Sequence, residues 1–200
     1  MKAITEREGE SFPHRILWRC VLAHYERARS IEKGSKHFDL TTMLMAYLTY
    51  EAYLNFVGDR LAPDLWAQEK SYFTTGKYAG LEGKLKKICE LCDGLKVNKG
   101  ARPYQTITML SVFRDSVVHA KPYKYEDSME HPVDREPDWW PRDSYDCVTE
   151  EQTSKVVEDV EKFIEFLHQK ALPHIHDKMF GDKALKGVLG YASSSTSFVE

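Results

Sequence analysis

The chain has no long hydrophobic run. No stretch reaches the roughly 18 uninterrupted apolar residues that a membrane helix needs. The opening residues MKAITEREGE carry charges where a secretory signal has its apolar segment. Only four cysteines occur in 200 residues, so we expect reduced thiols rather than a disulfide framework. These absences predict a cytoplasmic protein that does not contact a membrane.

A strong net charge and the familiar catalytic motifs are also missing. The formal net charge is −3, without the basic excess of many nucleic-acid binders, so any contact with phosphates has to come from a local patch. The sequence has no glycine-rich phosphate loop and no Ser-His-Asp pattern. Common hydrolase and nucleotide-binding folds are therefore not indicated.

The composition is sufficient for one hydrophobic core. Hydrophobic residues make up 42% of the chain and charged residues 30%, which is typical of a single domain of this length. We place this domain at residues 1–180. The terminal residues GYASSSTSFVE are small and polar with little to bury, so we expect residues 181–200 to form a flexible C-terminal tail.

Helical spacing of apolar residues dominates the pattern. Ser11 suits the cap and Pro13 the first turn of a helix that ends near Gly34, and a longer helix is expected from about Asp39 to Leu61. The apolar stripe of the first helix contains Ile16, Leu17, Cys20, Val21, His24 and Ala28. Later helices are expected over about 64–73, 81–94, 103–121 and 149–172, the last with Thr149 in a capping box. Short polar joins favour antiparallel neighbours, so the sequence predicts an all-α, up-and-down four-helix bundle with short extra helices.

Residues 122–148 interrupt this pattern. They contain four prolines, eight acidic residues and no sustained helical period. Five aromatic residues lie among them, namely Tyr123, Tyr125, Trp139, Trp140 and Tyr145. We expect an ordered acidic and aromatic insertion that packs over one end of the bundle before the last core helix. The two tryptophans are better suited to packing or partner recognition than to stacking on RNA, because the surrounding acidic residues repel phosphates.

Glu51 is a charged residue on an apolar stripe. It lies between Tyr47 and Leu54, at a position that should face the core, and a buried carboxylate needs a partner. Asn55 follows one helical turn later and offers a local hydrogen bond.

Arg114 is a second charged residue on an apolar stripe, between Leu110 and Val117. Its guanidinium cannot lose its charge in the interior. A buried ion pair between Arg114 and Glu51 would explain both residues without any catalytic role.

His119 lies five residues after Arg114, about 140° around the helix and ~7.5 Å along it. Pro122 disfavours continuation of the helix, so His119 is expected in the last turn, where the helix dipole favours an imidazolium. Asp115 precedes His119 by one turn and is placed to orient its ring.

The segment 114–119, Arg-Asp-Ser-Val-Val-His, resembles the signature of the HEPN superfamily, in which a histidine follows an arginine after about four to six residues. The polar residue after the arginine, here Asp115, also fits. Segment 46–55, AYLTYEAYLN, looks like the second bundle helix of many such proteins. The resemblance covers roughly residues 10–175, apart from the acidic insertion.

This resemblance implies a homodimer that brings two motifs to one cleft, often as a metal-independent endoribonuclease with no cofactor. His119 would be the general acid or base and Arg114 would hold the scissile phosphate, since forked guanidinium donors match phosphate oxygens. Asp115, Glu51 and Asn55 would support them. Such an enzyme would be a toxin or defence effector, with RNA as substrate and an antitoxin or other protein as partner. Many members lack activity, so a non-catalytic module for dimerisation or for ligand or protein binding is the alternative.

A run of basic residues precedes the motif helix. Lys84, Lys87, Arg102 and Lys121 are candidate contacts for the RNA backbone. The alternative is an ordinary solvated helix with its lysines pointing outward.

The spacing of Cys89 and Cys92 is typical of redox or zinc sites, but the pair lies within a predicted helix and has no matching second pair. We therefore expect half-buried structural thiols and no metal site. His174 and His176 would change this only if the fold brought them close to the cysteines.

Overall fold

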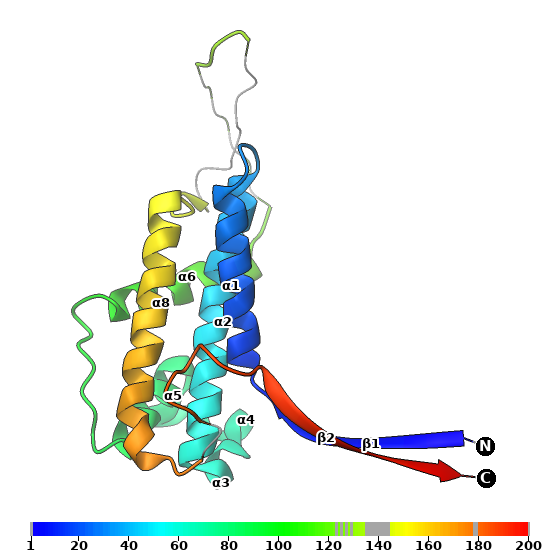
Figure 1. Cartoon of the computed structure of the whole chain (residues 1–200). Coiled ribbons are helices and arrows are strands. Elements are labelled where there is room, and N and C mark those ends of the chain that lie inside the picture. The colour runs from blue at the N-terminus through cyan, green and yellow to red at the C-terminus, as the bar shows by residue number, and fades with distance from the viewer. Residues whose placement is uncertain are drawn as a thin grey trace.

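Three long helices run side by side: α1 (Pro13–Arg29), α2 (Ser35–Leu61) and α8 (Glu150–Ala171). The central helix, α2, packs against both of the others (Figure 1). The computed structural model describes residues 2–122, 124, 126, 128, 130–134, 145–177 and 180–199, with side chains from residue 4 to residue 196 within these ranges. Tyr50 of α2 and Phe163 of α8 are both 2% exposed and meet at 5.7 Å between ring centroids, which places the core between these two helices.

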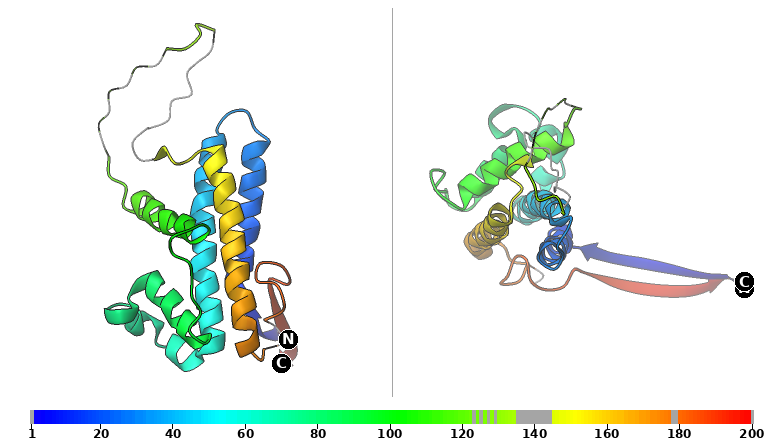
Figure 2. Two further views of the ribbon diagram at one scale, coloured as in Figure 1. Left: turned by 90° about the vertical axis from the view of Figure 1, so that its left-hand side faces the viewer. Right: turned by 90° about the horizontal axis from the view of Figure 1, so that it is seen from above.

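The fourth long helix, α6 (Tyr104–Val118), lies across α2 and α8 instead of alongside them (Figure 2). Its first turn is attached to α8, because Thr106 donates a hydrogen bond to Asp159 and Arg102 donates to the same carboxylate at 2.6 Å. Leu110 and Phe113 then bury the middle of the helix. The chain is therefore mainly α-helical as predicted, but the arrangement differs from four helices running up and down.

Short helical elements complete the lower part of the bundle. They are α3 (Pro63–Trp66), α4 (Glu69–Tyr72), the 3-10 turn η1 (Gly76–Tyr78), α5 (Gly80–Leu91) and the 3-10 turn η2 (Leu172–His174). Of these, α3 and α5 pack against α2. Gly58 of α2 allows this close approach, because a Cβ there would lie 1.9 Å from the Trp66 ring. The predicted short extra helices are thus present.

The helix starts agree with the sequence in one case and differ in another. Thr149 caps α8 as expected, and its hydroxyl accepts a hydrogen bond from the backbone N–H of Gln152 at 3.1 Å. Ser11 does not cap α1, whose N-cap is Phe12 without a side-chain cap. Ser11 is instead paired with Gly190 in a strand. The second helix begins at Ser35, earlier than predicted.

The buried face of α1 matches the predicted stripe only in part, since Val21 and Ala28 are buried as predicted. His14, Arg15 and Trp18 are buried, whereas Ile16 is 41% exposed. The cause is residues 180–188, which fold back over α1. Arg15 donates hydrogen bonds to the carbonyl oxygens of Phe180, Lys183, Ala184 and Val188. A distant segment therefore determines which side of α1 is buried.

The two ends of the chain form a sheet that the sequence did not predict. β1 (Lys2–Ser11) pairs antiparallel with β2 (Gly190–Val199), with Lys2 opposite Val199 and Ser11 opposite Gly190. This two-stranded ribbon projects away from the helices (Figures 1 and 2). The prediction of an all-α fold is thus wrong at the ends of the chain. The expected flexible tail at 181–200 is wrong for residues 190–199, because the partner strand lies at the far end of the sequence.

The acidic insertion is described only in part. Tyr123, Tyr125, Trp139 and Trp140 lie outside the described residues, so their predicted role stays a prediction. The described positions between 122 and 134 are exposed and do not cover the bundle. At the end of the insertion, Tyr145 and Val148 pack against the core. No helix in the described part of the chain is long and apolar enough to cross a membrane.

Candidate functional site

The predicted motif occupies the C-terminal end of α6. The helix ends at Val118, and the backbone N–H of His119 closes the last turn by donating to the carbonyl oxygen of Asp115 at 3.0 Å. The chain leaves the helix before Pro122, slightly earlier than the predicted end near Lys121. Arg114, Asp115 and His119 therefore lie at a helix end that faces solvent.

Arg114 is not buried as its position on the stripe predicts. Its side chain is 34% exposed, and its Nη1 donates to Oδ1 of Asp115 at 2.8 Å. The guanidinium also lies over the ring of Tyr47, 5.7 Å from the centroid. The pKa of Arg114 is raised, first by the hydrogen bond to Asp115. The guanidinium is thus charged, held from one side and open to solvent on the other.

The predicted buried ion pair between Arg114 and Glu51 does not form. Glu51 is half-buried, and no contact within 4.0 Å joins the two side chains. Its charge still acts on the site. The pKa of Tyr47 is raised, first by burial of the hydroxyl and next by the negative charge of Glu51. Glu51 also contributes to the raised pKa of Arg114. Arg114, Asp115, Tyr47 and Glu51 therefore form one electrostatic group across α6 and α2.

His119 is exposed and follows the last residue of α6. Asp115 pairs with Arg114 through Oδ1, and no hydrogen bond joins it to the His119 ring, so its predicted role of orienting that ring stays a prediction. The ion pair is itself exposed, with 59% of the Asp115 side chain accessible. An exposed pair of this kind contributes only about 0–1 kcal/mol, so a phosphate can replace Asp115 as the partner of Arg114 at little cost.

Asn55 and Lys84 form a hydrogen bond with each other and not with their predicted partners. The Lys84 ammonium donates to Oδ1 of Asn55 at 2.8 Å and also binds Glu69. Lys84 is only 6% exposed, so the predicted contact between Lys84 and RNA is wrong. No hydrogen bond joins Asn55 to Glu51, and the Asn55 side-chain oxygen accepts a hydrogen bond from the buried ammonium of Lys84. These residues join α2, α4 and α5.

The other candidate cations differ in availability. Arg102 binds Asp159 through two nitrogens, at 2.6 and 2.9 Å, and also pairs with Glu158. Arg102 therefore attaches the start of α6 to α8, and its guanidinium is already paired with carboxylates. The Lys87 ammonium lies 5.3 Å from the centroid of the Tyr78 ring. Lys121 is exposed and close in sequence to His119. Lys121 is thus the predicted RNA contact that is best placed next to the motif.

Cys89 is half-buried as predicted, whereas Cys92 is fully buried, and burial raises the pKa of each thiol to about 11. Thiols with such a raised pKa are poor nucleophiles at neutral pH. His174 lies 3.7 Å from Asp93. Within the described ranges, no three His, Cys, Asp or Glu side chains are grouped to hold a metal ion.

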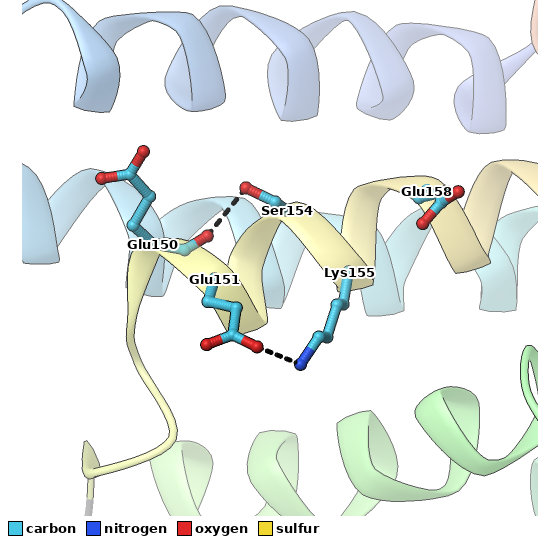
Figure 3. A pocket seen from close by; sticks show the side chains of 5 residues that line it. All are labelled: Glu150, Glu151, Ser154, Lys155 and Glu158. Carbon is cyan, nitrogen blue, oxygen red and sulfur yellow. Dashed lines mark hydrogen bonds and ion pairs between the residues drawn. The ribbon is translucent and has the colours of Figure 1, made fainter.

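One surface hollow lies along the start of α8 and does not contain the motif. Its lining residues are Glu150, Glu151, Ser154, Lys155 and Glu158 (Figure 3). Lys155 pairs with Glu151, and Glu158 pairs with Lys162. Carboxylates predominate in this hollow, so it repels phosphates and does not extend the candidate site.

Sequence reasoning missed the buried polar residues of α1 and α8. Asp159 is 2% exposed and lies three residues after Val156 on the buried stripe, so the argument used for Glu51 would have found it. His14 and His168 are fully buried. The signal for them was weaker, because histidine is common at both buried and exposed positions.

No family model matches the chain, and neither a curated protein nor a solved structure has significant similarity to it. The functional interpretation therefore depends on the motif and its surroundings. The central observation is an open Arg114 next to Asp115, with an exposed His119 at the end of the same helix.

Proposed function

We propose that this chain is a metal-independent endoribonuclease of the HEPN type, working as a homodimer, with a four-helix core formed by α1, α2, α6 and α8. The observation that carries the proposal is the state of Arg114. It is charged, accessible and free of a buried ion pair. A buried ion pair between Arg114 and Glu51, which would have explained both residues without catalysis, is therefore not the reason for Arg114. Such an enzyme fits the role of a toxin or defence effector.

The chemistry assigned to the site is an internal transfer at phosphorus. The ribose 2′-oxygen attacks the phosphate, the bond to the 5′-oxygen breaks, and a 2′,3′-cyclic phosphate and a 5′-hydroxyl form. An imidazole such as His119 accepts the proton from the 2′-hydroxyl or gives one to the leaving oxygen. Arg114 stabilises the charge that develops on the phosphate oxygens.

A second copy of the chain would supply a second motif histidine. Removing one proton and delivering another in a single step takes two groups, and each chain offers one motif histidine. Val112, two residues before the motif, and Val118, within it, are 68% and 55% exposed. A second copy that covers this end of α6 would bury both side chains. Lys121 would contact the RNA backbone beside this interface.

The first experiment compares RNA cleavage by wild type, His119→Ala and His176→Ala in EDTA. His176 is the matched control, because it is exposed and far in sequence from the motif. We expect wild type and His176→Ala to cleave at similar rates and His119→Ala to lose at least ~100-fold, the usual contribution of a general acid or base. Equal cleavage by all three would contradict the assignment.

The second candidate is a non-catalytic module for dimerisation or for ligand or protein binding. One observation favours it: four hollows on the described surface are lined by residues other than Arg114, Asp115 and His119. In that case α6 would associate with a partner such as an antitoxin through Val112 and Val118. Intact RNA with wild type, together with a stable complex that Val118→Asp disrupts, would favour this function.

A further inference from the structure

The ribbon of β1 and β2 is fixed at one end and exposed along the rest. At its base, the backbone N–H of Phe12 donates to the carbonyl oxygen of Leu189 at 2.7 Å, and Arg60 binds both Glu10 and Asp177. Beyond the base, the described side chains of both strands are exposed, and the ribbon extends away from the helices (Figure 1). The helices therefore set the direction of the ribbon without covering its faces or edges.

The ribbon has only two strands in the described part of the chain, with β1 and β2 as each other's partners. An isolated two-stranded ribbon is marginally stable in water, and three or more strands are normally needed. Each strand also presents a second edge of backbone N–H and C=O groups that remain available for pairing. Pairing with a further strand would therefore stabilise the ribbon.

The two edges differ in how well they are protected. β1 carries charges that discourage pairing, namely Lys2, Glu6, Arg7, Glu8 and Glu10. β2, with the sequence GYASSSTSFV, has no charged residue and no proline over its whole length. Charged residues and prolines are the usual means of blocking an edge strand. The edge of β2 is thus the unprotected one.

We infer that β2 pairs with β2 of a second copy, antiparallel about a two-fold axis, so that two ribbons form a four-stranded sheet with both β1 strands outside. A second copy is the occupant that charge favours, because two uncharged strands meet without repulsion. Pairing of two β1 strands would instead bring Glu6, Glu8 and Glu10 close to the same residues of the copy. Two-fold pairing also closes this interface on itself, because each β2 edge takes one partner strand. This interface is separate from α6 and does not depend on ribonuclease activity.

Single cysteines test the interface at the level of residues. In antiparallel pairing about a two-fold axis, residues at the axis meet their own copies at about 4.5–5.5 Å between Cα atoms, within the range of a disulfide. We would introduce Ser193→Cys, Ser194→Cys, Ser195→Cys and Thr196→Cys one at a time. Arg7→Cys and Glu6→Cys are the matched controls, since these residues lie opposite Ser194 and Ser195 across the ribbon.

Under mild oxidation we expect one or two neighbouring β2 variants to form a disulfide-linked dimer. The β1 variants and wild type, which has four native cysteines, should remain uncrosslinked. If no β2 variant crosslinks, or if the β1 variants crosslink equally well, the inference is overturned.

A charge placed on β2 gives a second measurement. Ser194→Lys should weaken self-association by about tenfold in sedimentation, because it brings two positive charges close together across the paired β2 strands. Val118→Asp removes association through α6, so both variants are also compared in that background. An association constant that Ser194→Lys leaves unchanged, or a wild type that is monomeric at all concentrations with Val118→Asp, overturns the inference.

Discussion

The buried histidine of α1 makes stability depend on pH. His14 is fully buried, with its ring 4.4 Å from that of Phe56 between centroids and edge-on to Tyr53. The pKa of His14 is lowered from 6.5 to about 3, first by burial and then by the positive charge of Arg15, and the charge of Arg60 acts in the same direction. The folded protein therefore holds this ring neutral.

The sign of the effect follows from proton binding. Between pH 6.5 and about 3 the unfolded chain binds a proton at His14 that the folded chain does not, so acidification favours unfolding. The stabilising contribution is complete above the unfolded pKa and is lost as pH falls toward the folded pKa. From pH 7.5 to about 4.5, the free energy of unfolding should fall by about 2.7 kcal/mol from this residue alone.

Urea unfolding of wild type and His14→Phe across this pH range measures the contribution. Phenylalanine keeps an aromatic ring among Phe12, Tyr53 and Phe56 but cannot bind a proton. Carboxylates and His168, whose pKa burial also lowers, titrate in both proteins and cancel in the comparison. The difference in free energy of unfolding between the two proteins should change by about 2.7 kcal/mol. A constant difference from pH 7.5 to about 4.5 would refute the reasoning.

Three further substitutions separate structural from functional polar residues. Asp159→Ala removes the acceptor of both Arg102 and Thr106 and should cost about 2 kcal/mol in urea unfolding, less than a fully buried pair because Arg102 stays hydrated. Glu158→Ala, an exposed neighbour, should change stability by no more than about 0.5 kcal/mol. Arg114→Ala should cost no more than about 1 kcal/mol, because it removes only an exposed ion pair and a contact with one ring. A loss of several kcal/mol for Arg114→Ala would indicate a structural role.

Local sequence patterns predicted the helices well because the information is local. The apolar period of α2, the capping Thr149 and the turn glycine Gly34 each act within a few residues. The crossing angle of α6 was not predictable in the same way. It depends on Arg102 and Asp159, which meet across 57 positions of the chain.

The strands and the face of α1 were missed for a related reason. Neither Lys2–Ser11 nor Gly190–Val199 has a pattern that indicates a strand without its partner. Arg15 is buried only because residues 180–188 provide carbonyl oxygens for its guanidinium. Both features come from contacts between the two ends of the chain.

The sequence singled out the candidate residues but did not predict how they pair. The sequence pointed to Arg114 and Asp115, and the structure joins them. The stripe pattern placed Arg114 toward the interior, where the structure leaves it half-exposed over Tyr47. A long arginine side chain reaches solvent from a position whose Cα lies near the core. The spacing of apolar residues places the Cα of Arg114 but does not show where its side chain ends.

The most direct test of the proposed function is the chemistry of the RNA ends. A mixed RNA pool is incubated in EDTA with wild type or Arg114→Ala, and the ends of the fragments are mapped. The proposal predicts fragments with 2′,3′-cyclic phosphate and 5′-hydroxyl ends from wild type and nearly intact RNA from Arg114→Ala. Intact RNA with wild type, or fragments ending in a 3′-hydroxyl, would contradict it.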